Sequence, residues 1–147
     1  MASLYLSVAD VDAAIGSTRR QNLFATETGT YLTADYTRVV QYSSALVKAA
    51  AQNAGYSLGD TTTDDVVVTA SLGQFLKMAY GRKGGEVPDQ WDSAVALLEA
   101  IRTGAVPIPS LTPSTRDGSG GSVFTESSTS ITNSSRQIFS RREQNVY

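Results

Sequence analysis

The last 38 residues of the chain limit its fold more than any other feature of the sequence. Residues 110–147 contain 15 Ser or Thr side chains, and their first 26 residues are dominated by Ser, Thr, Gly and Pro. A segment of this composition cannot bury enough apolar surface to offset its conformational entropy, so we expect a disordered free arm. The core must therefore come from residues 1–109, which we predict to form one domain, with residues 110–147 as an extended arm.

Apolar side chains in residues 1–109 recur at spacings of three and four, as they do along one face of an α-helix. The pattern predicts three longer helices, over residues 33–54, 64–80 and about 88–102. Short helices are expected over residues 8–15, capped by Ser7, and from a second cap at Ser17. The sequence thus predicts an all-α fold: a small antiparallel helical bundle of three longer helices plus one or two short ones.

The segments that follow two of these helices are predicted to be non-helical. Residues 55–63 form a linker that supplies a helix cap at Thr62 or Thr63, and residues 105–113 leave the bundle in an extended conformation because three prolines interrupt them. The expected core side chains of the longer helices are Tyr36, Val39, Val40, Leu46, Val47, Ala50, Val68, Leu72, Phe75, Leu76, Ala79, Trp91, Ala94, Val95, Leu98 and Ile101.

Composition argues against catalysis. The chain has no His and no Cys, which removes imidazole bases, thiolate nucleophiles and the usual zinc ligands. A Ser nucleophile would need a Lys base, and the three lysines are expected to face solvent. We therefore expect no enzyme activity, no cofactor and no metal site.

Paired carboxylates occur three times, at Asp10 and Asp12, at Asp64 and Asp65, and at Asp89 and Asp92. Each pair could serve acid–base chemistry or a hard metal ion, but each also falls in the first turn of a predicted helix. We interpret all three pairs as helix-terminal residues that complement the helix dipole.

Basic side chains are too few for a dedicated nucleic-acid binder, since the net charge is −2. The segment GRKGGE (residues 81–86) lacks the residue order of a phosphate-binding loop and follows a helix. We interpret Arg82 and Lys83 as cations at a helix C-terminus, and Arg19 and Arg20 as part of a solvated helix face. The alternative is a contact with the DNA backbone, made by many copies in a ring, through Arg19, Arg20, Arg82 and Lys83.

The final twelve residues, RQIFSRREQNVY, differ from the polar segment before them. They combine aromatic, aliphatic and Arg side chains, the types found at the buried centres of interfaces. We predict an anchor for a partner protein, formed by Arg136, Ile138, Phe139, Arg141, Arg142, Val146 and Tyr147. The preceding 26 residues would act as a tether that spans roughly 85 Å when extended.

These features together resemble a known family. A helix reading WDSAVALLEAIRTGAVPIP, followed by a low-complexity stretch and a terminal Phe-Ser-Arg motif, is similar to the Mu-like head-to-tail connector proteins of tailed bacteriophages, also called adaptor or head-completion proteins. The matching positions are Leu98, Ile101, Gly104, Phe139, Ser140 and Arg141.

The resemblance implies a structural virion protein, assembled in the host bacterial cytoplasm and located in the virion neck. Such proteins form a homo-oligomeric ring, commonly of twelve copies, beneath the portal protein. The ring lines the channel through which double-stranded DNA passes without sequence recognition, and it gives the tail or stopper protein a platform. The C-terminal arm reaches along or between portal subunits.

Three alternatives remain open at this point. A tail terminator or stopper protein of the neck is typically richer in β-strands. A small DNA-packaging module would bind DNA with a steep salt dependence. An enzyme would depend on a carboxylate such as Asp64 or Asp89. No segment approaches ~18 consecutive apolar residues, so we expect a soluble protein without a membrane partner.

Overall fold

A computed structural model describes residues 3–113 of the chain. Its elements are α1 (Val8–Ile15), α2 (Ser17–Leu23), α3 (Thr33–Asn53), α4 (Asp65–Arg82), the 3-10 helix η1 (Asp89–Trp91) and α5 (Asp92–Arg102). Within this part of the chain the only β-type pairing is a single bridge between Ala25 and Tyr31. The predicted all-α class is confirmed.

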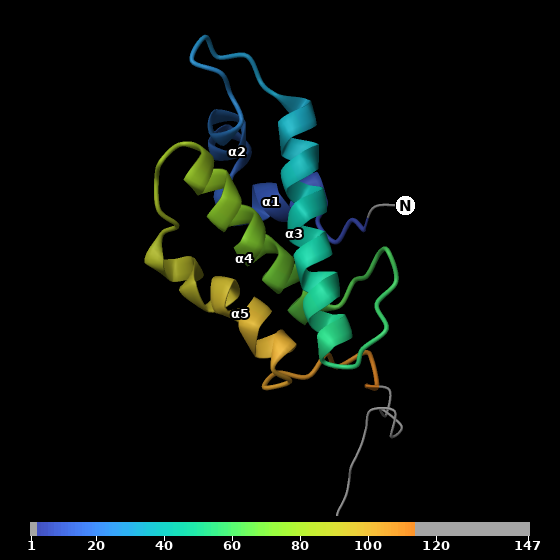
Figure 1. Ribbon diagram of the computed structural model, residues 1–147. Helices are drawn as coiled ribbons and strands as arrows, with labels where there is room; N and C mark the ends of the chain where they lie inside the picture. The colour runs from blue at the N-terminus through green and yellow to red at the C-terminus, as the bar shows by residue number, and fades with distance from the viewer. Residues whose placement is uncertain (1–2, 114–147) are drawn as a thin grey trace, which may run out of the picture. The chain divides into compact units, whose positions relative to one another are not determined.

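The three longer helices form the body of the molecule. Helix α4 packs against both α3 and α5, and α3 also contacts α5. Figure 1 shows α3 and α4 running in opposite directions, with α1 and α2 beside the end where α3 begins and α4 finishes. The arrangement is the antiparallel bundle that the apolar periodicity predicts.

Two hydrophobic clusters fill the bundle. The first core lies around three aromatic rings, Phe24, Tyr36 and Phe75, whose centroids are 5.4–5.7 Å apart. It joins α1, α2, the first half of α3 and the second half of α4. Edge-to-face contacts such as that between Phe24 and Tyr36 add to the free energy gained by burying the rings.

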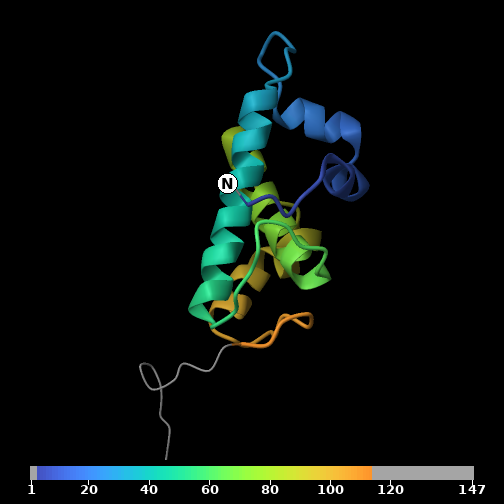
Figure 2. The same ribbon diagram turned by 90° about the vertical axis from the view of Figure 1, so that its right-hand side faces the viewer.

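The second core lies at the other end of the bundle and depends on residues outside the predicted helices. Tyr5 from the N-terminal lead-in and Tyr56 and Leu58 from the predicted linker are all buried there. The backbone N–H of Tyr5 donates to Ser44 Oγ at 3.0 Å, which ties the lead-in (residues 3–7) to α3. Figure 2 shows the lead-in passing α3 on its way into α1.

The segment after α5 also belongs to this core, contrary to the prediction that it leaves the bundle directly. Ile108 is fully buried, its N–H donates to Tyr56 Oη at 3.3 Å, and Leu111 packs against the same cluster. Ser110 donates to Asp64 Oδ2 through both its N–H and its hydroxyl. The prolines exclude a helix, but they do not prevent the segment from folding back, and the compact body continues to Thr112.

The predicted N-cap residue is correct for one helix and wrong for two others. Ser7 and Asp10 form a reciprocal capping box at α1, as expected of a Ser cap. The N-cap of α2 is Gly16, so the prediction of Ser17 is wrong by one residue. The N-cap of α4 is Asp64, whose Oδ1 accepts from the N–H of Val66, and neither predicted threonine has this role.

The predicted core positions are correct in α3 and α4 with two exceptions. Leu46 is 44% exposed and lies on the outer side of α3, and Val68 is half-buried while its neighbour Val67 is fully buried. In α5 only Ala94 and Ile101 are buried. The other predicted members of its stripe, Trp91, Val95 and Leu98, remain partly exposed.

Candidate functional site

Four basic residues formed the alternative set of DNA contacts, and three of them lie near the end of the body where α4 finishes. Arg19 Nη1 donates to Tyr80 Oη at 2.8 Å, and Lys83 Nζ donates to the carbonyl of Ala25 at 2.7 Å. Lys83 follows Arg82 directly, so α2 and the end of α4 place the three cations at the same end of the body. We refer to Arg19, Arg82 and Lys83 as the cationic cluster.

Arg82 is the most constrained member of this cluster. Its Nη2 lies 3.0 Å from Asp35 Oδ2, and its guanidinium carbon lies 5.1 Å from the centroid of the Phe24 ring. Asp35 also accepts from Arg38, so one carboxylate links the start of α3 to the end of α4. Arg82 therefore has two contacts that hold its guanidinium within the chain, although all three residues of the cationic cluster are exposed.

Arg20 is not part of the cationic cluster. Both interpretations of Arg20 from the sequence, as a solvated residue and as a DNA contact, are therefore corrected. Its side chain is 10% exposed, and it donates to both oxygens of Asp12, at 2.5 and 3.1 Å, and to Tyr31 Oη at 2.9 Å. The guanidinium also lies within 6 Å of the ring centroids of Tyr31 and Tyr36. With its donors engaged inside the protein, Arg20 is neither a solvated residue nor a DNA contact.

This ion pair also corrects the interpretation of Asp12 as a helix-terminal residue. Hydrogen bonds from Arg20 hold the pKa of the Asp12 carboxyl below its usual range, and hydrogen bonds from Asp12 raise the pKa of Arg20. Burial raises the pKa of the neighbouring Tyr36 hydroxyl to about 12. The pair fastens α1 to α2 and both to the turn before α3, which is a structural role.

The other predicted acidic pairs lie at helix starts, as expected. Asp64 caps α4, Asp65 lies in its first turn, and Asp89 and Asp92 lie in the first turns of η1 and α5. Among residues 3–113 no group of three acidic side chains is close enough to hold a metal ion. In the same range no helix is both long and apolar enough to cross a membrane.

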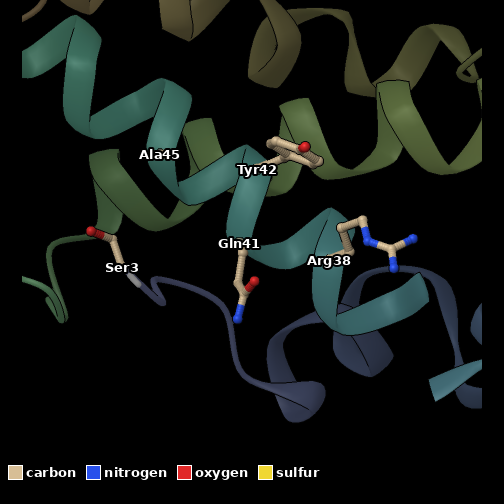
Figure 3. A pocket seen from close by; sticks show the side chains of 5 residues that line it. All are labelled: Ser3, Arg38, Gln41, Tyr42 and Ala45. Atoms are coloured by element: carbon tan, nitrogen blue, oxygen red, sulfur yellow. The ribbon is translucent and has the colours of Figure 1, made fainter. Parts of the chain in front are cut away.

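A shallow groove on α3 is a feature that the sequence did not reveal. Ser3 from the lead-in and Arg38, Gln41, Tyr42 and Ala45 from α3 enclose about 330 Å³. Figure 3 shows Arg38, Gln41 and Tyr42 projecting from α3, with the lead-in that carries Ser3 passing beside this helix. Tyr42 is 60% exposed, which is unusual for so large a ring.

The apolar side chains around this groove form one outer side of α3. Tyr42, Ala45, Leu46 and Ala49 are all exposed, and their spacing places them along one stripe, with Arg38 one turn before Tyr42. We call these five residues the α3 face. The signal available in the sequence was that α3 carries apolar residues at more positions than one buried stripe can hold.

The predicted anchor lies outside the described residues. Arg136, Ile138, Phe139, Arg141, Arg142, Val146 and Tyr147 all follow Pro113, the last residue that the structure describes. Their role stays a prediction.

Comparison of the chain with protein-family models, with curated proteins and with solved structures finds no match in any of the three.

Proposed function

We propose that this chain is a structural protein of a tailed-bacteriophage virion, a head-to-tail adaptor. Copies form a ring beneath the portal protein, line the DNA channel and join the capsid to the tail. The C-terminal arm docks on the portal. The ring lies in the virion neck after assembly in the bacterial cytoplasm.

The observation that carries this proposal is the combination of a compact helical body with a further stretch of sequence that ends in apolar and Arg residues. The body has its own cores and ends at Thr112. The chain then continues for 35 residues, of which the last twelve combine Arg, aromatic and aliphatic side chains. In such a chain the terminal segment can bind one partner protein while the helical body assembles with other subunits.

The helical body favours an adaptor over a tail terminator or stopper, since those neck proteins are typically rich in β-strands. Two of the positions that carry the family resemblance have clear structural roles in the body. Ile101 is fully buried in the second core, and Gly104 adopts a φ of 78° after the end of α5. That left-handed conformation suits Gly because other residues are strained in it.

Multiplicity strengthens a weak anchor. If each arm of a ring binds one portal subunit, the second and later arms bind at a high effective concentration. Phe139 and Tyr147 would fill apolar pockets on the portal, and Arg141 and Arg142 would pair with its carboxylates. Passing DNA would meet the exposed side chains of Arg19 and Lys83 only briefly, at phosphates.

The test is a pull-down of the portal protein by the full chain and by a chain that ends at Leu111. This truncation retains Ile108, Ser110 and Leu111, so the contacts that close the second core remain. We expect the truncated chain to lose portal binding while its far-UV circular dichroism stays helical. Binding by the truncated chain at full strength would show that the body docks and that the arm has another role.

A matched pair of point variants separates the anchor from the rest of the arm. Phe139→Ala should weaken portal binding about tenfold or more, because aromatic anchors are the residues most often responsible for interface affinity. Phe124→Ala removes the same ring from the tether and should leave binding unchanged. Equal losses in the two variants would contradict the assignment of the anchor to the last twelve residues.

A further inference from the structure

Two sides of the body have complementary character. The α3 face presents exposed apolar side chains and Arg38, whose side chain is 62% exposed and is paired with Asp35 of the same helix. Helix α5 presents a different surface, which we call the α5 face: Asp92, Val95, Ala96 and Glu99, spaced at i, i+3, i+4 and i+7. It carries two apolar side chains between two carboxylates, of which Glu99 is paired with Arg102 of the same helix.

The two faces lie on different sides of the molecule. The buried residues of α3 and of α5 point toward the other helices of the bundle, so each exposed face points away from it. Figure 1 shows α3 and α5 at the two flanks of α4. A subunit with two different complementary surfaces on separate sides can associate head to tail, which closes into a ring when the rotation per subunit allows.

The α5 face is only partly covered within a single chain. Val95 is only partly buried, and no ion pair within residues 3–113 involves Asp92. The α3 face likewise has apolar side chains without cover. Burying both in one contact removes apolar surface from water and brings Arg38 toward the carboxylates of α5.

We infer that the α3 face of one copy packs on the α5 face of the next copy. This inference rests on the proposed ring and specifies its lateral contact. Charge favours the unlike pairing: two α3 faces would bring their Arg38 side chains together, and two α5 faces would bring together Asp92 side chains, which have no ion pair within residues 3–113. The unlike pairing avoids both repulsions.

The absence of cysteine from the sequence allows a clean test by disulfide trapping. Ala45→Cys places a single thiol on the α3 face, and Ala96→Cys places one on the α5 face, and both positions are exposed. In full-length chains mixed under mild oxidation, we expect covalent dimers of one variant with the other. A chain with both substitutions should give a ladder of covalent multimers. Dimers of Ala45→Cys with itself in equal yield, or no cross-links at all, would overturn the inference.

A charge-reversal series tests the same contact without cross-linking. Arg38→Glu should lower the association constant of the full chain about tenfold, measured by sedimentation or light scattering, and a further Asp92→Lys change should restore it. Lys77→Glu makes the same charge change at an exposed position of α4 outside both faces and should leave association unchanged. Equal effects of Arg38→Glu and Lys77→Glu would contradict the contact.

The outcomes of these tests are separable from those for the anchor, because neither assembly experiment contains a portal protein. Loss of cross-linking with intact arm-dependent portal binding would reject the lateral contact and retain the adaptor role. Cross-linked multimers without arm-dependent portal binding would support the ring contact while rejecting the proposed anchor.

Discussion

At the residue scale, the buried hydroxyl groups of this protein differ in whether they have hydrogen-bond partners. Ser44 Oγ accepts from the N–H of Tyr5, and Ser43 Oγ donates to the carbonyl of Val40 at 2.9 Å. Ser71 Oγ and Tyr36 Oη are equally buried but have no partner within residues 3–113. A buried polar atom without a partner loses its hydration and gains nothing in return, so these two groups reduce stability.

Substitution of two fully buried serines by Ala should therefore have opposite effects. Ser71→Ala removes an unpartnered hydroxyl and should leave the free energy of unfolding unchanged or raise it by up to about 1 kcal/mol. Ser44→Ala leaves the Tyr5 N–H buried without an acceptor and should lower it by about 1–3 kcal/mol. Urea denaturation measures both. Because the same atom is deleted each time, equal losses would show that Ser71 does have a partner in the folded protein.

At the element scale, the spacing between α4 and α5 depends on one residue without a side chain. A Cβ at Gly73 would overlap the carbonyl group of Ala94 and the nitrogen of Val95, which are backbone atoms and cannot rotate away. The helices approach this closely only because Gly73 allows it. Gln74 then donates through Nε2 to the carbonyl of Val95 at 3.0 Å, which adds a polar contact beside the apolar one.

Gly73→Ala should separate these helices and lower the free energy of unfolding by about 3 kcal/mol, at the upper end for overpacked cores. Gly81→Ala is the matched control, since it lies in the same helix with open space where its Cβ would be. That variant should raise stability by about 0.5–1 kcal/mol, because Ala is the better helix former. Thermal melts followed by circular dichroism compare the two. A mild effect at Gly73 would mean that α5 can shift without loss of packing.

The helices were predictable from the sequence to within a few residues because periodicity and capping act locally. Helix α1, with its Ser7 cap, was predicted with the bounds that the structure has. The burial of Tyr5, Tyr56 and Ile108 was not predictable in this way. These residues lie outside helices and reach their core through contacts between segments about 50 residues apart, for which a local pattern carries no signal.

The candidate site was predictable in composition but not in arrangement. Four basic residues stood out, and the structure brings Arg19, Arg82 and Lys83 to one end while it turns Arg20 inward. Arg19 and Arg20 are adjacent on a short helix, so their side chains point in different directions and only Arg20 reaches Asp12. Their directions depend on how α2 packs against α1 and α4, which one sequence does not specify.

At the scale of the whole molecule, carboxylates on three segments hold the body together. Hydrogen bonds from Arg20 to Asp12, and from Lys48 to Asp60, hold the pKa of each carboxyl below its usual range. Burial opposes ionisation of Asp64, but hydrogen bonds from Ser110 and from the start of α4 keep its pKa lowered as well. All three are therefore ionised more easily in the folded chain than in the unfolded one.

This has a defined consequence for acid stability. Groups with a lowered pKa in the folded state stabilise the protein fully above their unfolded pKa of 3.8 and lose that contribution as the pH falls through the folded value. We expect the urea midpoint to decline as the pH falls below about 4. Asp12→Asn should be less stable at pH 7 and decline less steeply in acid.

Glu27→Gln provides the comparison, since Glu27 is an exposed carboxylate in the turn before α3. Its acid profile should follow that of the unmodified chain. Parallel profiles for Asp12→Asn and the unmodified chain would show that the pair with Arg20 does not contribute to acid sensitivity.

The tie between Ser110 and Asp64 also determines where a mechanical load on the chain is felt. Tension applied to the chain beyond Pro113 first meets Leu111, which packs on the second core, then Ser110, which is bonded to the cap of α4, and then the buried Ile108. Helix α5 ends at Arg102, before all three residues in the chain, so the pull does not reach it while their contacts hold. Helix α5 cannot be unwound from its C-terminal end until the contacts of Leu111, Ser110 and Ile108 have all broken.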